Sequence, residues 1–323
     1  MKMNSSKMFF LSFMIVGVMI CLCSNNWLFI WAGLELSLVT LLPILQSKLI
    51  ITSESMMKYF LVQSISSGFL IIGMMTMLSD LTVNNMLMTF AILMKMGVAP
   101  FHSWLISVIE SIQPLPLLII LTISKVPPLM ILSFIQASTS MIVVITMLVG
   151  SIMGLNQTAI KKLVTYSSIF NMGLIILAIK NNFIWMIYLI VYSTLLLLLI
   201  WVLTSTNSLY VNQLIFSENF LVNKFTLWIN LLSMGGMPPL LGFSIKLMVI
   251  EFAVSKLMIV NLVMIILLST IVMFFYLRMV YLTLMFYSMT PKWWMLNSNK
   301  FTLIVIMVNF TLTPLILMTK VMN

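Results

Sequence analysis

The sequence predicts an all-α protein that crosses a membrane many times, and three observations support this prediction. Of the 323 residues, 62% are hydrophobic and only 7% are charged, a composition outside the range of soluble globular domains. The hydrophobic residues form runs of about 20 residues, long enough for a helix to cross a bilayer. The charged residues do not collect into a segment able to fold in water. Nearly the whole chain is therefore expected to lie in the bilayer.

The apolar runs, taken in order, predict about eleven membrane helices. The first run follows Met1-Lys2 as in a signal peptide, but it continues directly into the second run, so we interpret it as a membrane helix. The expected ranges are 5–24, 26–46, 55–78, 85–112, 115–135, 137–155, 158–180, 183–206, 225–256, 257–288 and 300–320.

Short polar segments separate these helices. The segment Pro291-Lys292-Trp293-Trp294 places tryptophan beside lysine, a combination typical of the membrane interface. The other breaks lie near residues 24–26, 47–48, 80–85, 156–157 and 180–182, and a longer polar connector, expected to be a surface loop, spans 204–224.

Two of the expected helices carry residues that interrupt a helix. The fourth contains Gly97 and Pro100, and the ninth contains Gly235-Gly236 and Pro238-Pro239. Proline removes a backbone donor and clashes with the preceding turn, and glycine adds slack. Irregular backbone at membrane depth is tolerated only inside protein or beside a wet cavity, so the two breaks point to a site for an ion or a substrate.

The broken helix is the fourth member in each of two sets of five. Because five is odd, a second copy of the set must run in the opposite sense across the membrane. The sequence therefore predicts two inverted five-helix repeats, over residues 1–135 and 136–290, followed by a C-terminal helix within 291–323.

Four ionisable residues lie near the middle of long apolar stretches: Glu35, Lys95, Lys125 and Lys246. A charge at the bilayer centre costs roughly 3 kcal/mol on insertion scales. A purely structural membrane protein could avoid these costs. We therefore expect the four residues to handle charge across the membrane.

Glu35 is the only carboxylate deep in the first half of the chain, and it is the natural counter-charge for Lys95. Burial favours the neutral amine, whereas a carboxylate within ~4–6 Å favours the ammonium. Making and breaking the pair would let Lys95 hold and release a proton. The alternative is a static ion pair that only fixes two helices.

The second half of the candidate path is less defined. Lys125 precedes Pro127-Pro128, and Lys246 follows the second break. Glu251 is a candidate partner for Lys246 or an acceptor on the exit side. His102 is a candidate relay, because histidine titrates near neutral pH, or else a satisfied structural histidine.

Composition excludes several other function classes. The net charge of +10 comes from dispersed basic residues without an interleaved aromatic stripe, which indicates contact with anionic lipid and no nucleic acid. Two cysteines and one histidine form no metal-ligand spacing, disulfide framework or bis-histidine haem site. We expect no cofactor and no metal in this chain.

The two broken segments, together with Ser124-Lys125-Val126-Pro127 and the segment 163–169, resemble the signature segments of the antiporter-like membrane subunits of respiratory complex I. The resemblance covers most of the chain. It implies two inverted five-helix repeats with a polar axis at mid-membrane. By motif, Glu35 matches the family's glutamate, Lys95 its first-half pumping lysine, Lys125 its bridging lysine and Lys246 its second-half lysine. The proline that usually precedes the second-half lysine is Ile245 here.

The resemblance also implies a function. The chain would translocate protons in the membrane arm of NADH:ubiquinone oxidoreductase, with no redox centre or nucleotide site of its own. It would lie in the mitochondrial inner membrane beside neighbouring antiporter-like subunits, other membrane-arm subunits and anionic lipid such as cardiolipin. The 33 methionines suit an organellar genome. The alternatives are a cation/proton antiporter subunit and a passive membrane-arm scaffold.

Overall fold

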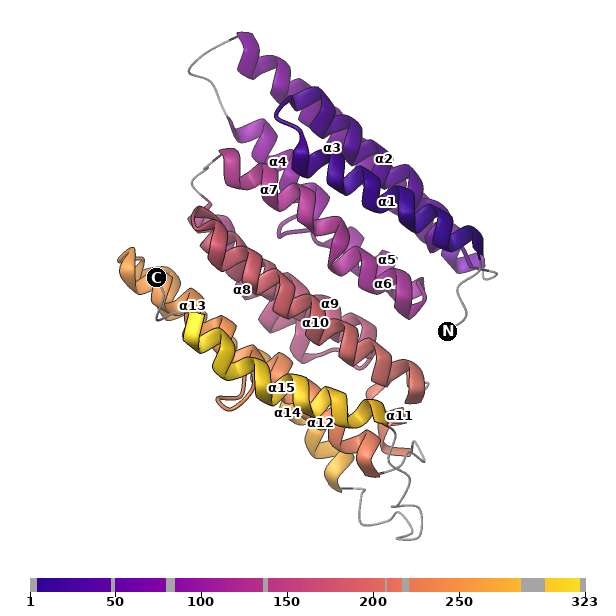
Figure 1. Cartoon of the computed structure of the whole chain (residues 1–323), viewed down its shortest axis with the longest axis vertical. Coiled ribbons are helices and arrows are strands. Elements are labelled where there is room, and N and C mark those ends of the chain that lie inside the picture. Colours follow the sequence, from indigo (N-terminus) through magenta and orange to yellow (C-terminus); the bar gives the residue numbers. More distant parts are fainter. Residues whose placement is uncertain are drawn as a thin grey trace. The chain divides into compact units, whose positions relative to one another are not determined.

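The computed structural model describes residues 5–47, 50–79, 85–135, 139–206, 208–216, 221–285 and 300–319. Helices make up almost all of this part, and it contains no strand beyond one isolated bridge (Figure 1). Seven helices among the described residues are long and apolar enough to cross a membrane. The all-α membrane fold is thus confirmed. The interface segment 291–294 and the expected break at 80–84 lie outside the described residues.

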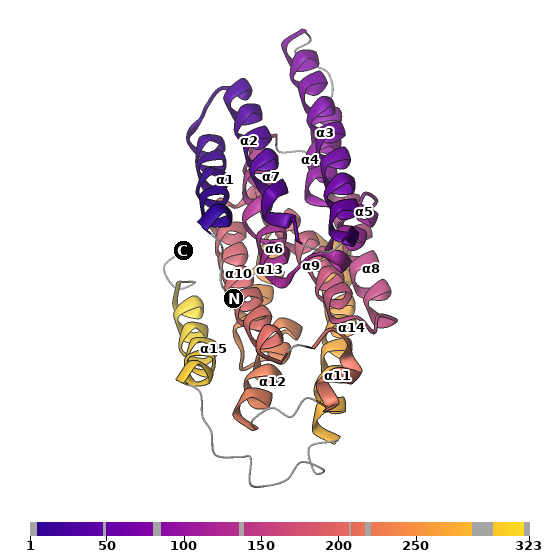
Figure 2. The same cartoon turned by 90° about the vertical axis from the view of Figure 1, so that its right-hand side faces the viewer.

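The chain forms two compact units, residues 1–139 and 140–323. In the first unit, α1 packs along α2, and α3 lies against both α4 and α5, as Figure 2 shows. Helix α7 contacts α1 and α4. The helices of this unit are α1 (Ser5–Cys23), α2 (Trp27–Leu45), α3 (Ile50–Ser79), α4 (Asn85–Met96), α5 (Ser103–Ser111), α6 (Pro114–Leu121), the 3-10 turn η1 (Ile123–Lys125) and α7 (Val126–Ile135).

In the second unit, α9 is the central helix. Every residue from Leu163 to Leu177 is buried, against neighbours that include α8, α10 and α13. The helices of this unit are α8 (Ser140–Leu155), α9 (Ile160–Leu177), the 3-10 turn η2 (Ala178–Lys180), α10 (Asn182–Thr206), α11 (Val211–Phe216), α12 (Leu221–Gly235), α13 (Leu241–Ser255), α14 (Ile259–Met285) and α15 (Lys300–Thr319).

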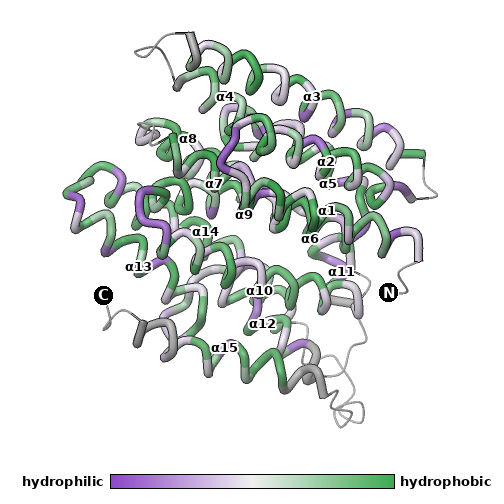
Figure 3. Tube along the Cα trace, turned by 45° about the horizontal axis from the view of Figure 1, so that its top comes forward, coloured by the Kyte–Doolittle hydropathy of each residue, from purple (hydrophilic) through white to green (hydrophobic). Residues whose placement is uncertain are grey.

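The polar connector before α12 is more ordered than the sequence suggested. It contains the short helix α11, and Tyr210 forms an isolated antiparallel bridge with Ala159. Two backbone hydrogen bonds make this bridge, from Ile160 N–H to the Leu209 carbonyl and from Val211 N–H to the Thr158 carbonyl. The start of α9 is therefore tied to this connector. Over most of the helices hydrophobic residues predominate, as expected for segments in a bilayer (Figure 3).

The structure interrupts the fourth and ninth expected helices where the sequence predicted. Helix α4 ends before Gly97, whose φ is +67°, and α12 ends before Gly236, whose φ is +88°. The residue after each glycine donates its N–H five residues back, to the Leu93 carbonyl and to the Leu232 carbonyl, both at 3.1 Å. This is the closure of a Schellman motif, which needs a left-handed residue and so favours glycine.

A third interruption was not predicted. The range 115–135 was expected to be one helix, but it is divided into α6, η1 and α7. Thr122 leaves the helical region, with φ −123° and ψ −76°. Pro127 and Pro128 have no N–H to offer the carbonyls of Ile123 and Ser124, which weakens an α-helix at this place. The interruption places Lys125 at the end of a 3-10 turn.

Candidate functional site

Lys95 lies in the last turn of α4, with 8% of its surface exposed. Its position follows from the break, because Gly97 ends the helix two residues later. Glu35, half-buried on α2, lies within electrostatic reach of the Lys95 amine. No ion pair within 4.0 Å joins these two described residues. The structure therefore brings the expected counter-charge near Lys95 but not into contact with it.

Lys125 is almost fully buried, and its Nζ has no hydrogen-bond partner among the described residues. Lys125 and Lys95 line the same cavity of about 20 Å³, inside the first unit. A cavity above about 10–15 Å³ by this measure has room for one water molecule. The cavity is also lined by the polar side chains of Ser37, Tyr59, Gln63 and Ser124. Two lysines therefore line one small, polar space.

Lys246, in the second unit, is held differently. Its Nζ donates a 2.7 Å hydrogen bond to the carbonyl of Gly235, the last residue of α12, and lies 5.7 Å from the centroid of the Phe170 ring. The last carbonyls of a helix lack partners within it and carry partial negative charge. The Gly235 carbonyl, at the broken end of α12, is therefore the hydrogen-bond acceptor for the Lys246 amine.

Gly236 makes this contact possible in two ways. Its positive φ closes the end of α12, and a Cβ at this position would lie only 2.8 Å from the Lys246 Nζ. Any other residue would be strained and would also crowd the amine. Sequence reasoning assigned Gly236 to the break but did not foresee its contact with the lysine.

The two candidate relay residues, Glu251 and His102, lie on α13 and directly before α5. Glu251 is half-buried on α13, and five residues place it about 140° around the helix axis from Lys246. His102 is half-buried before α5, with Nδ1 3.2 Å from the Pro100 carbonyl oxygen. Their relay roles stay predictions.

Several polar residues near the candidate site escaped the sequence reasoning. Gln63, on α3, lines the cavity and donates its side-chain N–H to the Lys95 backbone carbonyl at 3.2 Å. In the second unit, Tyr276 donates to Ser167 at 2.6 Å and Tyr188 donates to Asn171 at 2.9 Å, both on α9. A lone glutamine inside an apolar helix was the only available signal for Gln63.

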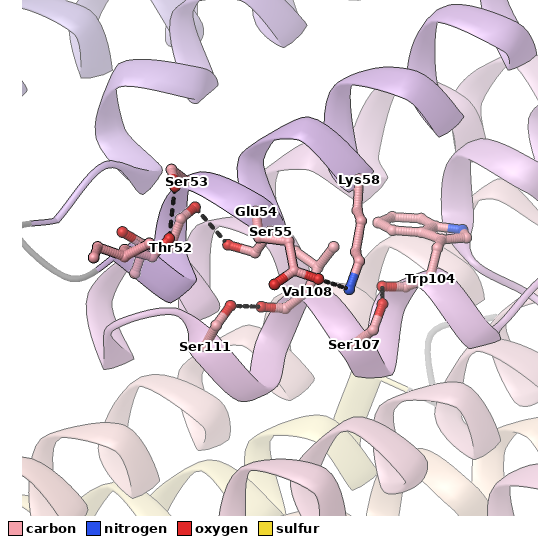
Figure 4. A network of polar contacts seen from close by, with 10 residues as sticks. Thr52, Ser53, Glu54, Ser55, Lys58, Trp104, Ser107, Val108 and Ser111 are labelled. Carbon is pink, nitrogen blue, oxygen red and sulfur yellow. Dashed lines mark hydrogen bonds and ion pairs between the residues drawn. The ribbon is translucent and has the colours of Figure 1, made fainter.

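Among the described residues, a network of polar contacts in the first unit reaches the site only through Trp104, which also lines the cavity. Figure 4 shows α3 beside α5, with the Glu54–Lys58 ion pair at 2.6 Å and the hydroxyls of Ser107 and Ser111 bonded to carbonyls of their own helix. Both members of the ion pair are largely exposed. Exposed pairs at i, i+4 contribute little, about 0.3–0.5 kcal/mol, so this pair has no evident part in the buried site.

Comparison with known proteins gives one family. A family model described as "NADH:quinone oxidoreductase/Mrp antiporter, TM" matches residues 24–82 and 78–273. NADH-ubiquinone oxidoreductase chain 2 of Anopheles gambiae is 35% identical over 322 residues, covering 94% of each chain. The corresponding protein of Locusta migratoria is 33% identical and covers 94% of this chain and 92% of its own.

Solved structures share the fold. A chain of respiratory complex I from Thermus thermophilus with bound aureothin superposes with a TM-score of 0.79 at 21% identity, covering 88% of this chain and 71% of that one. A chain of an Mrp complex from a Dietzia species gives 0.74 at 16% identity, with 84% and 59% covered. At these identities the likeness concerns the fold alone.

Proposed function

Because this chain belongs to the NADH:quinone oxidoreductase/Mrp antiporter family, among the chain 2 subunits of NADH-ubiquinone oxidoreductase, we propose that its buried lysines carry the protons that the complex translocates. The chain is a multi-pass subunit of the complex I membrane arm in the mitochondrial inner membrane. One observation carries the proposal: Lys95 and Lys125 line one polar cavity inside the first unit.

The first step concerns Glu35 and Lys95. While Glu35 is ionised and near, Lys95 keeps its proton, and loss of that charge makes Lys95 a better donor. Two unit charges 5 Å apart interact by about 3 kcal/mol at an effective dielectric constant of 20. Moving one charge against 100 mV requires about 2.3 kcal/mol. A change in this single interaction is therefore large enough to drive one transfer.

The second step passes the proton from Lys95 to Lys125. The shared cavity supports a transfer through one water molecule, since it has the room and the polar lining. Lys125 has an unpartnered Nζ, whose lone pair in the neutral amine can accept a proton from such a water while the water takes one from the Lys95 ammonium. Lys125 then passes the charge on to the second unit.

In the second unit, Lys246 receives the proton. The carbonyl of Gly235 supports its charged form, because the ammonium donates to the partially negative end of α12. Glu251 is proposed as the acceptor on the exit side, and His102 as a relay in the first unit. Lys246 would give up its proton when the break at Gly236 changes shape.

The architecture that goes with this function is two inverted five-helix repeats, over 1–135 and 136–290, with a last membrane helix in 291–323 and about eleven membrane helices in all. The matching closures at Gly97 and Gly236 support the repeat. Redox chemistry takes place in other subunits, and this chain needs no cofactor or metal. Its partners are neighbouring antiporter-like and other membrane-arm subunits, with cardiolipin or another anionic lipid at the lysines near the helix ends.

The test is the Lys95→Met variant in the assembled complex, reconstituted in liposomes. We expect fewer protons pumped per electron, with NADH still reducing quinone, because methionine has a similar volume but carries no proton. An unchanged ratio in a fully assembled complex would mean that the chain is a passive scaffold.

A cation/proton antiporter is the second candidate, since the family model and a solved Mrp complex share this fold. Proton pumping driven by NADH oxidation, measured with and without sodium in liposomes, separates the two functions. Equal pumping without sodium supports proton translocation alone. Pumping that stops without sodium supports the antiporter.

A further inference from the structure

The end of α4 that carries Lys95 leaves backbone carbonyls without partners in the helix, as every helix end does. The backbone closure at Gly97 uses only the carbonyls of Leu93 and Met94. Two side chains from other helices complete the end. Trp104 Nε1, on α5, donates to the Met94 carbonyl, and Gln63 Nε2, on α3, donates to the Lys95 carbonyl, each at 3.2 Å.

Gln63 is well placed to control Lys95. It is buried, with 6% of its surface exposed, and it binds the backbone of Lys95 itself. It also lines the cavity that Lys95 and Lys125 share. If this hydrogen bond changes, the backbone of Lys95 moves, and the lysine side chain moves with it.

The two units differ in what occupies the carbonyl end of the broken helix. In the second unit the ammonium of Lys246 itself donates to the Gly235 carbonyl. In the first unit the side-chain donors are neutral, and they bind carbonyls slightly earlier in the last turn, Gln63 that of Lys95 and Trp104 that of Met94. Lys95 itself lines the cavity together with Lys125.

We propose that Gln63, assisted by Trp104, is a positioning residue for proton transfer: their hydrogen bonds fix the last turn of α4, so that Lys95 stays at the cavity it shares with Lys125. The inference rests on the proposed role of Lys95 as a proton carrier. Without Gln63, the Lys95 carbonyl loses its side-chain donor, and the last turn of α4 is held less firmly against α3.

The experiment compares Gln63→Met and Trp104→Phe in the assembled complex, in liposomes, by protons pumped per electron. Both substitutions remove an N–H donor and keep most of the volume. Ser55→Ala is the control, since Ser55 is a buried polar residue of α3 whose hydroxyl bonds only within the helix, to the Thr52 carbonyl. We expect pumping to fall by roughly a factor of five in Gln63→Met, the cost of one unmade buried hydrogen bond, and not in Ser55→Ala.

Lys95→Met, measured alongside, keeps the two proposals distinguishable. If Lys95→Met loses pumping while assembled Gln63→Met and Trp104→Phe pump normally, the positioning role is wrong and the carrier role stands. If Lys95→Met itself pumps normally, the carrier role is wrong. If Gln63→Met does not assemble, Trp104→Phe decides, because it removes a donor from the same helix end.

Discussion

The three lysines of the candidate path differ in what their amines contact. Lys95 faces a polar cavity near a carboxylate, Lys125 has no hydrogen-bond partner among the described residues, and Lys246 donates to a helix end. These environments differ for an ammonium, because a carboxylate, a small polar space and a carbonyl group stabilise it unequally. Such a graded series suits a proton that moves from one amine to the next.

The unpartnered amine of Lys125 leads to a prediction in which stability and activity change in opposite directions. In Lys125→Met we expect the unit to become more stable by about 1–3 kcal/mol, because a buried polar group without a partner is replaced by an apolar one of similar size. Proton pumping should fall in the same variant. Thermal unfolding of the assembled complex and pumping in liposomes measure the two effects. A destabilised variant would contradict the unpartnered state of Lys125.

At the scale of helices, the breaks determine where the lysines lie. Both breaks could be predicted from glycine and proline, since these residues end helices for reasons of local backbone chemistry. The interruption before Lys125 was missed because Thr122 leaves the helix in a segment where prolines follow the break by several residues. Gln63 was missed because its bond to Lys95 spans 32 residues in sequence, and such a contact depends on how helices pack.

The break at Gly236 leads to the second prediction. Gly236→Ala should cost about 1–2 kcal/mol, because a non-glycine residue is strained at positive φ, and should also lower pumping, because its Cβ crowds the Lys246 amine. Unfolding and pumping assays on the assembled complex measure the two effects.

Two glycine variants serve as controls for this prediction. Gly235→Ala has no positive φ, and its Cβ has no neighbour closer than 3.6 Å, so it should change little. Gly97→Ala shares the strain, but its Cβ meets Leu105 and Trp104 rather than a lysine. Pumping can fall in both Gly97→Ala and Gly236→Ala because the protein unfolds more easily. If the loss of pumping per kcal/mol of lost stability is the same in the two variants, crowding of the Lys246 amine has no effect on function.

At the scale of the whole molecule, composition alone predicted the membrane fold, and the comparisons with known proteins confirm the family and the function. The charge pattern Glu35, Lys95, Lys125 and Lys246 was visible because charges are rare in apolar helices. The counter-charge of Lys95 could be predicted, but the group that accepts from Lys246 could not. The Gly235 carbonyl is part of the main chain, and every residue has one, so no sequence pattern marks it.

A single proton path through both units makes a prediction for the whole chain. If Lys95 and Lys246 act in series, the double variant Lys95→Met/Lys246→Met should lose no more pumping than the worse of the two single variants, because residues that act as one unit have non-additive effects. Protons pumped per electron in liposomes measure this. Additive losses would mean that the two units carry separate protons.

The complete burial of α9 has a consequence for biogenesis. A helix whose residues from Leu163 to Leu177 are all buried in its own protein has no face for lipid, and its serines and asparagine find their partners inside the protein. It cannot be threaded into place after its neighbours have closed around it. The segments on either side must therefore enter the membrane with it as one group, and the insertion machinery has to retain α9 until they arrive.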